Sequence, residues 1–269
     1  TRATIGDEGG ILSIDVDGRP EALQLPITGS VLGRRVDSNS DVGSASALSA
    51  DGEAIYISYF NSTSKDLKLA QSANRGTDWS VSTVASEGAV GSRSALRVAG
   101  SDISIAHAAD STTDLSLAYS TDSGANWTMS TVEAGYRGTL PGIAVGTSRW
   151  FVGCQNDDYY RLFYSDNRET WTLSDSAYSS IHEDEEYDSF CTLADKTTVM
   201  TVFFERYDGL RFRRSEDNGV TWGTDVVVST AGDRYACLAE LDGTLYLSYC
   251  GEGGTPLYVS NSSNDGATW

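Results

Sequence analysis

The sequence predicts an all-β chain built from repeated four-stranded units. Its 269 residues include 27 Gly and only 4 Pro, and many are Ser, Thr, Val and Tyr, which favours short strands joined by tight turns. No run of ten or more residues has the apolar spacing of a helix. A turn motif also recurs at intervals of 45 to 50 residues, which is the signature of a repeat architecture.

The motif begins with Ser and ends with Trp, and its first copy contains Ser72, Asn74, Gly76 and Trp79. The Asp or Asn side chain can accept hydrogen bonds from turn amides, and Gly can adopt a positive φ. The Trp is expected to pack against the neighbouring sheet. The motif therefore predicts a turn between the third and fourth strands of each unit, at residues 72–79, 120–127, 165–171, 215–222 and 262–269. The copy at 165–171 is one residue shorter and lacks the Gly.

Segments of alternating apolar and polar residues precede these turns and predict strands. Second strands are expected at residues 54–60, 102–107, 198–204 and 244–249. Third strands are expected at residues 67–70, 115–119 and 210–213. Four strands per repeat at this period indicate a β-propeller of four-stranded antiparallel blades.

The repeated motif resembles the Asp-box, or bacterial neuraminidase repeat, and the chain is similar to the sialidase superfamily over residues 44–269. This resemblance implies the propeller fold. It does not by itself imply sialidase activity, because Asp-boxes also occur in other glycosidases, in sorting receptors and in phage or surface proteins.

Residues 1–43 lack the motif, although residues 11–16, 21–25 and 31–36 have strand-like patterns. The last repeat ends at Trp269, where the other repeats continue into a fourth strand. We expect an N-terminal strand to fill that place and close the ring, which predicts one domain over residues 1–269. Six blades are expected, with five as the alternative; a further alternative is a piece of a longer protein that ends inside a blade.

The charge of the chain limits its partners. With 38 acidic and 19 basic residues, the formal net charge is −19. Nucleic acid is excluded because phosphate binding needs clustered Lys and Arg, which no loop carries. Membrane insertion is excluded because no apolar stretch approaches the roughly 18 to 20 residues of a membrane span. The composition favours an extracellular, secreted, or virion- or cell-surface location.

Candidate site residues come from the face opposite the repeated turns, where propeller loops surround the central axis. In sialidases three arginines grip the substrate carboxylate, a Glu-activated Tyr attacks the anomeric carbon, and an Asp acts as acid and base. The resemblance implies catalytic roles for Tyr187, Glu186, Glu205 and Asp158, and substrate contacts by Arg93, Arg137 and Arg234. Two features depart from the family: Tyr187 precedes Arg234, and the Arg-Ile-Pro motif is absent.

The same loops concentrate carboxylates and aromatic side chains, which suit the hydroxyl groups and apolar faces of sugars. Tyr159 and Tyr207 are the predicted aromatic contacts. The leading hypothesis is a propeller module that recognises or attaches to glycans. A sialidase-like exo-glycosidase is one alternative, and an architectural module of a phage or surface assembly is another. No cofactor is required, although the oxygen-rich loops leave calcium open.

The four cysteines are too widely spaced for a paired zinc motif. Cys237 and Cys250 flank the turn at Asp242 and Gly243. A hairpin would bring them almost opposite each other, so they predict a disulfide, with buried free thiols as the alternative. His107 and His182 are isolated and are interpreted as histidines whose hydrogen bonds are satisfied.

Overall fold

The computed structural model covers residues 1–269 and describes residues 3–5, 11–14, 23–26, 35–38, 41–109, 114–135, 139–155, 159–178, 190–205, 209–230, 232–251 and 256–269. It divides into two compact units, Thr1–Ser38 and Asn39–Trp269. In the first unit, β1 (Ala3–Ile5), β2 (Ile11–Ile14) and β3 (Leu23–Pro26) form an antiparallel sheet in chain order. The strands expected at 11–16 and 21–25 are confirmed over residues 11–14 and 23–25, and the rest of each expected range lies outside the described residues. Arg35 and Val36, at the end of the strand expected at 31–36, are not in a strand.

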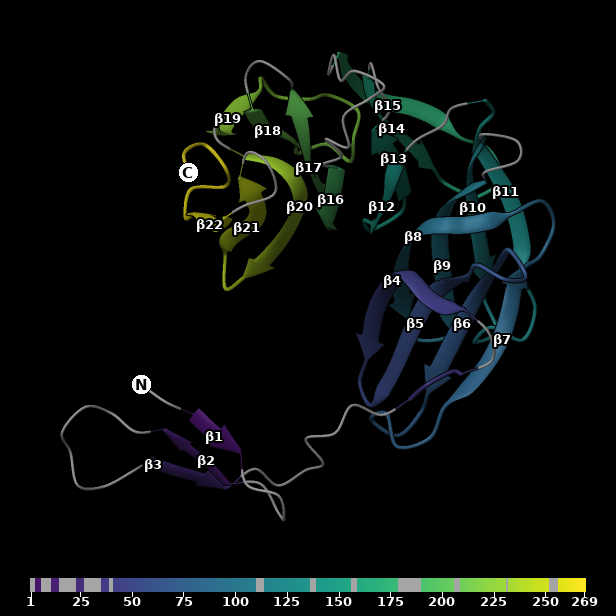
Figure 1. The fold of residues 1–269 in the computed structure, drawn as a ribbon. Helices are drawn as coiled ribbons and strands as arrows, with labels where there is room; N and C mark the ends of the chain where they lie inside the picture. The colour runs from purple at the N-terminus through teal and green to yellow at the C-terminus, as the bar shows by residue number, and fades with distance from the viewer. Residues whose placement is uncertain are drawn as a thin grey trace. The chain divides into compact units, whose positions relative to one another are not determined.

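The second unit consists of five antiparallel sheets, each with its strands in chain order (Figure 1). We call them blades 1 to 5. Blade 1 contains β4 (Val42–Asp51), β5 (Ala54–Asn61), β6 (Asp66–Ser72) and β7 (Ser80–Ala85). Blade 2 contains β8 (Val90–Ala99), β9 (Asp102–Ala109), β10 (Asp114–Ser120) and β11 (Thr128–Glu133).

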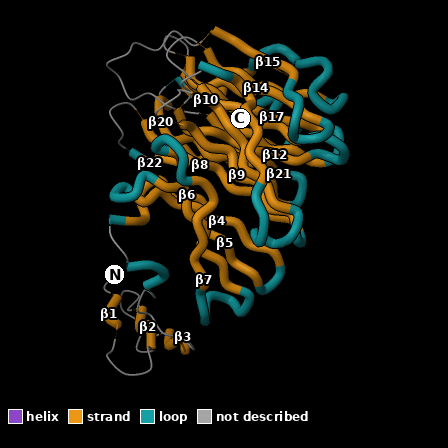
Figure 2. Tube along the Cα trace, turned by 90° about the vertical axis from the view of Figure 1, so that its right-hand side faces the viewer, coloured by secondary structure: helices purple, strands orange, loops and turns teal. Residues whose placement is uncertain are grey.

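Blade 3 contains β12 (Thr139–Val145), β13 (Trp150–Gln155), β14 (Tyr159–Ser165) and β15 (Thr172–Tyr178). Blade 4 contains β16 (Phe190–Asp195), β17 (Thr198–Glu205), β18 (Gly209–Ser215) and β19 (Val226–Ser229). Blade 5 contains β20 (Gly232–Leu241), β21 (Thr244–Gly251) and β22 (Leu257–Ser262). All the second and third strands expected from the sequence are confirmed. Strands joined by short loops make up the described chain, and no helix occurs in it (Figure 2).

Apolar side chains between successive blades form the core. The first strands of neighbouring blades lie next to each other, β4 by β8, β8 by β12, β12 by β16 and β16 by β20. Between blades 1 and 2, for example, Leu67 and Leu69 pack with Ile103 and Ile105, and all four are fully buried. Similar clusters fill the other three junctions. The fold is therefore a β-propeller of antiparallel blades, as the sequence predicts.

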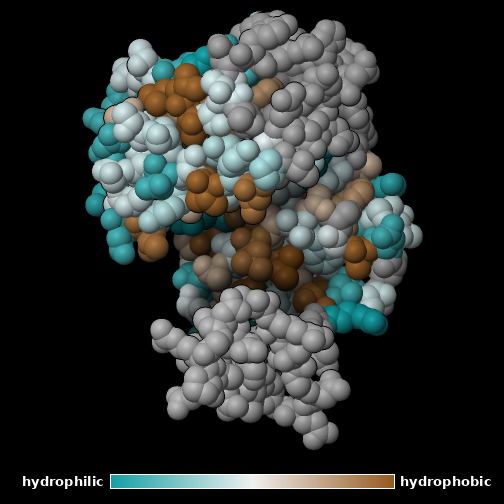
Figure 3. Space-filling view, turned by 60° about the vertical axis from the view of Figure 1, so that its left-hand side comes forward, coloured by the Kyte–Doolittle hydropathy of each residue, from teal (hydrophilic) through white to brown (hydrophobic). Residues whose placement is uncertain are grey.

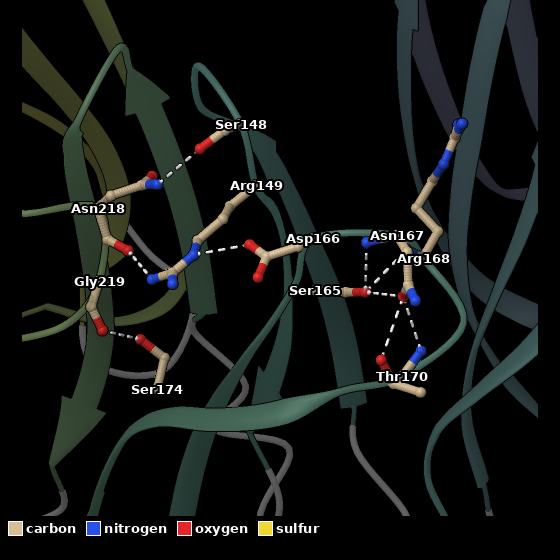
Figure 4. Close-up of polar contacts among 10 residues, drawn as sticks. All are labelled: Ser148, Arg149, Ser165, Asp166, Asn167, Arg168, Thr170, Ser174, Asn218 and Gly219. Atoms are coloured by element: carbon tan, nitrogen blue, oxygen red, sulfur yellow. Dashed lines mark hydrogen bonds and ion pairs between the residues drawn. The ribbon is translucent and has the colours of Figure 1, made fainter.

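The repeated turns have the geometry that their residue types require. In blade 2 the Ser120 hydroxyl accepts a hydrogen bond from the Gly124 amide at 2.9 Å, and the Asp122 carboxylate accepts one from the Asn126 amide at 2.9 Å. The shorter copy in blade 3 keeps both bonds, from Arg168 to Ser165 at 2.7 Å and from Thr170 to Asn167 at 3.0 Å (Figure 4). Arg168 has φ 66°, so a residue other than Gly holds the left-handed conformation there.

Each turn from blade 3 onward also docks on the blade before it. Gly219 in the turn of blade 4 has φ 77°, and a Cβ at this position would lie 2.6 Å from the ring of Phe151 in blade 3. Ser174 of blade 3 donates to the Gly219 carbonyl at 2.6 Å, and Arg149 donates to the Asn218 carbonyl at 2.8 Å (Figure 4). The Trp222 indole donates to Ser174 at 3.2 Å. The turn motif therefore joins the blades as well as reversing the chain.

Ring closure and the number of blades stay predictions. Among the described strands, blade 5 has three, and β1, β2 and β3 pair only with one another. The boundary between the two compact units lies near the start of the repeats that the sequence places at residue 44. That the chain forms one domain is likewise a prediction.

The cysteine pairing expected from the sequence is wrong. Cys237 and Cys250 are both free thiols. The two-residue turn between β20 and β21 pairs Leu241 with Thr244, and this register places Cys237 opposite Ser248. Cys250 lies two residues farther along β21, opposite Arg234. The two cysteines lie on neighbouring strands but do not face each other.

Candidate functional site

The predicted site residues that the structure describes, Arg93, Tyr159 and Glu205, lie toward the end of the blades opposite the repeated turns. Arg93 lies half-buried in β8, Tyr159 begins β14, and Glu205 ends β17. The backbone of Arg234 belongs to β20, but its side chain lies outside the described residues. The other predicted residues also lie outside them: Tyr187, Glu186, Asp158, Arg137 and Tyr207. Their convergence on one pocket therefore stays a prediction.

A β-bulge displaces the start of several first strands. In blade 2 the register with β9 shifts between Val90 and Ser94, so Arg93 lies inside the irregular segment. Blades 1, 3 and 5 have a similar irregularity in β4, β12 and β20. Bulges re-aim side chains at the ends of sheets, often beside functional sites. The backbone at this end of the propeller is therefore irregular, and side chains there do not alternate regularly between the two faces of the sheet.

Corresponding positions of the first strands can be compared by counting from their last paired residues, Ala99 in blade 2 and Leu241 in blade 5. By this count Arg93 is equivalent to Tyr235, and Arg234 precedes that position by one residue. Tyr235 has φ 55° and is 54% exposed. Sequence reasoning did not single out this aromatic side chain, although counting back from the turn at Asp242 and Gly243 would have found it.

Glu205 forms an ion pair within its own blade. Its carboxylate lies 3.0 Å from Nε of Arg211 on the neighbouring strand β18. Arg211 is more buried than its partner, with side-chain exposures of 14% and 32%. The Nε–H of Arg211 donates to the Glu205 carboxylate, so Glu205 is a hydrogen-bond acceptor at the rim of this face.

Tyr159 belongs to a cluster that bridges blades 2 and 3. Its ring is 40% exposed, and the guanidinium carbon of Arg161 lies 6.0 Å from the ring centroid. Arg161 in turn forms an ion pair with Glu133 of β11 at 3.2 Å. The cluster therefore presents an aromatic ring beside a cation and a carboxylate.

Gln155 holds the same end of blades 3 and 4 together. It is fully buried, and its side-chain amide donates to the Phe204 carbonyl at 2.8 Å and accepts from the Phe204 amide at 3.4 Å. Gln155 is the last residue of β13, so its side chain ties this end of β13 to β17 of the next blade.

No group of three or more His, Cys, Asp or Glu side chains suited to a metal ion occurs among the described residues. Several of the acidic loops that suggested calcium lie outside those residues, so calcium binding is untested. No helix in the described part of the chain is long and apolar enough to cross a membrane.

Comparison with solved structures gives a sialidase-like propeller fold. A Hadza microbial sialidase matches 84% of this chain with 53% of its own length, at a TM-score of 0.57 and 14% identity. The Trypanosoma rangeli sialidase in complex with the inhibitor DANA matches 82% of the chain with 47% of its own length, at a TM-score of 0.54 and 11% identity. The chain thus spans about half the length of these sialidases.

The fold is also similar to that of a lectin. Aleuria aurantia lectin, as a mutant in complex with alpha-methyl-L-fucoside, matches 80% of the chain with 72% of its own length, at a TM-score of 0.52 and 14% identity. No family model and no curated protein matches the sequence. At these identities the likeness shows the fold, and function has to be argued from the residues of this chain.

Proposed function

We propose that this chain is a glycan-recognition module of an extracellular or surface protein, which binds through the end of the blades that carries Tyr159. The observation that carries the proposal is the cluster of Tyr159, Arg161 and Glu133. An exposed ring offers the apolar contact that a sugar face needs, and the adjacent charged groups offer hydrogen bonds to its hydroxyls. The solved structures with a similar fold, two sialidases and a fucoside-bound lectin, support the same class of ligand.

The surface chemistry is compatible with a hydroxyl-rich ligand. Apolar surface, in brown, lies in separate patches among hydrophilic groups on the view of Figure 3. The net charge of −19 disfavours acidic partners in general. A neutral glycan therefore fits this chain better than an acidic one.

A glycan array with the whole chain tests the proposal. Replacing Tyr159 by Ala should weaken binding to the recognised glycans by roughly tenfold, the size of one lost aromatic contact. Tyr246→Ala is the matched control, because Tyr246 is also 40% exposed but lies on β21 in blade 5. Equal loss in both variants, or no glycan bound by the wild type, would contradict the proposal.

A sialidase-like exo-glycosidase is the second candidate, favoured by the position of Arg93 and Glu205 at the same end of their blades. The roles predicted for Tyr187, Glu186, Asp158, Arg137 and Arg234 belong to this candidate. Hydrolysis of a panel of fluorogenic glycosides that includes a sialoside tests it. Turnover that disappears in Tyr187→Phe would support a glycosidase. Binding on the array without any turnover would support glycan recognition without catalysis.

A further inference from the structure

A pocket of about 480 Å³ lies between blades 1 and 2, apart from the Tyr159 cluster. Blade 1 contributes Val84 and Ala85 at the end of β7, and the connection to blade 2 contributes Ser86 and Glu87. The other lining residues come from blade 2: Val90, His107, Ser116, Met129, Ser130 and Thr131. This volume is within the range of small-molecule sites.

The polar side of the pocket is a row across three strands of blade 2. Ser116 of β10 pairs directly with His107 of β9 and with Thr131 of β11. Residues directly opposite each other in an antiparallel sheet present their side chains on the same face. One imidazole and two hydroxyls therefore lie side by side on the face of blade 2 that is directed to blade 1.

His107 is the unusual member of this row. It is 3% exposed, and neither ring nitrogen makes a hydrogen bond of good geometry with another described residue; the backbone of Ala108 is close enough only to offset part of the effect of burial on the pKa of the ring. The ring is therefore incompletely satisfied, which differs from the interpretation of His107 as a satisfied histidine. Burial lowers its pKa to about 4, so at neutral pH the ring carries one N–H donor and one acceptor nitrogen. Buried polar groups without partners are uncommon and call for a ligand or water to satisfy them.

The repeats explain why the cavity forms at this junction. Ser116 lies on the third strand, four residues before the Ser of the turn. In each of the four remaining blades this position holds a long side chain. Those residues are Lys68, Arg161, Arg211 and Tyr258, each paired across its sheet as Ser116 is. The small Ser116 leaves empty the volume that a Lys, Arg or Tyr fills elsewhere.

We propose that this pocket binds one neutral, polyhydroxylated ring of monosaccharide size. The row of His107, Ser116 and Thr131 supplies donors and acceptors for hydroxyl groups, and Val84, Val90 and Met129 supply an apolar wall. The pocket is lined by no Lys or Arg among the described residues, and its one carboxylate is Glu87. An anionic sugar has no counter-charge there, which selects a neutral ring.

Ligand-observed NMR by saturation transfer tests this site with neutral hexoses, L-fucose, N-acetylglucosamine and myo-inositol at millimolar concentration. Methyl glycosides of the same sugars distinguish a terminal glycan residue from a free sugar. N-acetylneuraminic acid serves as the anionic probe. The wild-type chain should transfer saturation to at least one neutral ring and not to the anionic one.

The repeats also supply the variant. Ser116→Arg introduces the side chain that blades 3 and 4 carry at this position and should reduce the transfer at least tenfold. Thr128→Arg is the control, because Thr128 is exposed on β11 and does not line the pocket. If Ser116→Arg does not fold, Ser116→Lys places the residue of blade 1 in the same volume.

A second readout does not depend on any variant. The ring signals of His107 should shift on titration of the wild-type chain with the neutral probe that gives saturation transfer. No transfer to any neutral ring, equal transfer in the Ser116 variant, or preference for the anionic probe would overturn the inference. The result is independent of the Tyr159 site, because Tyr159→Ala leaves this pocket intact and Ser116→Arg leaves Tyr159 intact.

Discussion

Arg213 of blade 4 and Asp175 of blade 3 form a partly buried ion pair between adjacent sheets. Nη1 of Arg213 lies 2.8 Å from Oδ1 and 3.0 Å from Oδ2 of Asp175. Nε of the same guanidinium bonds Asp225 at 2.5 Å, and the Tyr160 hydroxyl donates to Asp175. Burial and then the charge of Asp175 raise the pKa of Tyr160, which keeps it a neutral donor. One arginine thus forms ion pairs with two carboxylates in the junction of blades 3 and 4.

Replacing Arg213 by Met should destabilise the propeller strongly. The Met side chain keeps much of the apolar volume but leaves two partly buried carboxylates without a cation, which should cost about 3 kcal/mol, the lower end of the range for breaking a buried pair. Arg214→Met is the control, because the ion pairs of Arg214 with other described residues are with exposed Glu216 and Asp265 at 3.6 and 3.4 Å. Its loss should cost less than about 1 kcal/mol. Urea denaturation of both variants measures the difference, and equal midpoints would contradict the role given to Arg213.

The Trp of each repeated turn should act through packing more than through its hydrogen bond. Trp222 packs against the core between blades 3 and 4 and donates to Ser174. Trp222→Ala should lower the free energy of unfolding by about 3 kcal/mol or more, whereas Trp222→Phe should cost about 1 kcal/mol through the lost bond and smaller ring. Thermal unfolding followed by circular dichroism measures both. An unchanged melting temperature in Trp222→Ala would contradict the structural role of the motif.

Much of the fold could be predicted because the repeated turn is a local signal with a physical cause. Ser120, Asp122 and Gly124 each have a residue type that the turn geometry needs, so the sequence marks the turn directly. The strands before it follow from apolar alternation. Bulges such as the one between Val90 and Ser94 could not be predicted, because an inserted residue shifts pairing without changing composition.

The candidate sites were less accessible from sequence than the fold. Tyr159 was predicted because an aromatic residue beside charged residues in a loop is visible in the sequence itself. The row of His107, Ser116 and Thr131 was not predicted, because only strand register brings these residues together. Only an alignment of the repeats could have indicated this row from the sequence, because Ser116 occupies a position where the other four blades have Lys, Arg or Tyr.

The four cysteines should differ in reactivity according to their burial. Cys237 is exposed, whereas Cys154 is fully buried. Burial, followed by the proximity of Cys237, raises the pKa of the Cys191 thiol, which lowers its thiolate fraction. Iodoacetamide should therefore modify Cys237 first in the native protein, Cys191 more slowly because of its raised thiol pKa, and Cys154 only after denaturation. Mass spectrometry of peptides measures the order, and native labelling of Cys154 as fast as Cys237 would contradict it.

His107 should make stability depend on pH below neutrality. Its pKa is lowered from 6.5 to about 4 by burial, so the unfolded chain binds the proton more readily. The stabilisation is complete above pH 6.5 and is lost as the pH falls toward 4, by about 3 kcal/mol in all. His107→Gln should remove this slope while other groups titrate as before. Urea midpoints of both proteins between these pH values measure it, and parallel profiles would show that His107 is accessible to solvent.

Asp217 in the turn of blade 4 should add a second, more acidic dependence. Hydrogen bonds from the Thr221 side chain and then its amide lower the pKa of Asp217 from 3.8 to about 2. A lowered carboxylate pKa stabilises the folded state above pH 4 and stops doing so as the pH falls through 2. Asp217→Asn should keep the bond from the Thr221 amide, as Asn74 and Asn264 do from the amides of their own turns, and lose the acid dependence. Asp217→Ala should lose both the hydrogen bond from the Thr221 amide and the acid dependence of stability. Thermal unfolding between pH 5 and pH 2 separates the two effects, and an Asn variant with the same acid dependence as the wild type would assign that dependence to other carboxylates.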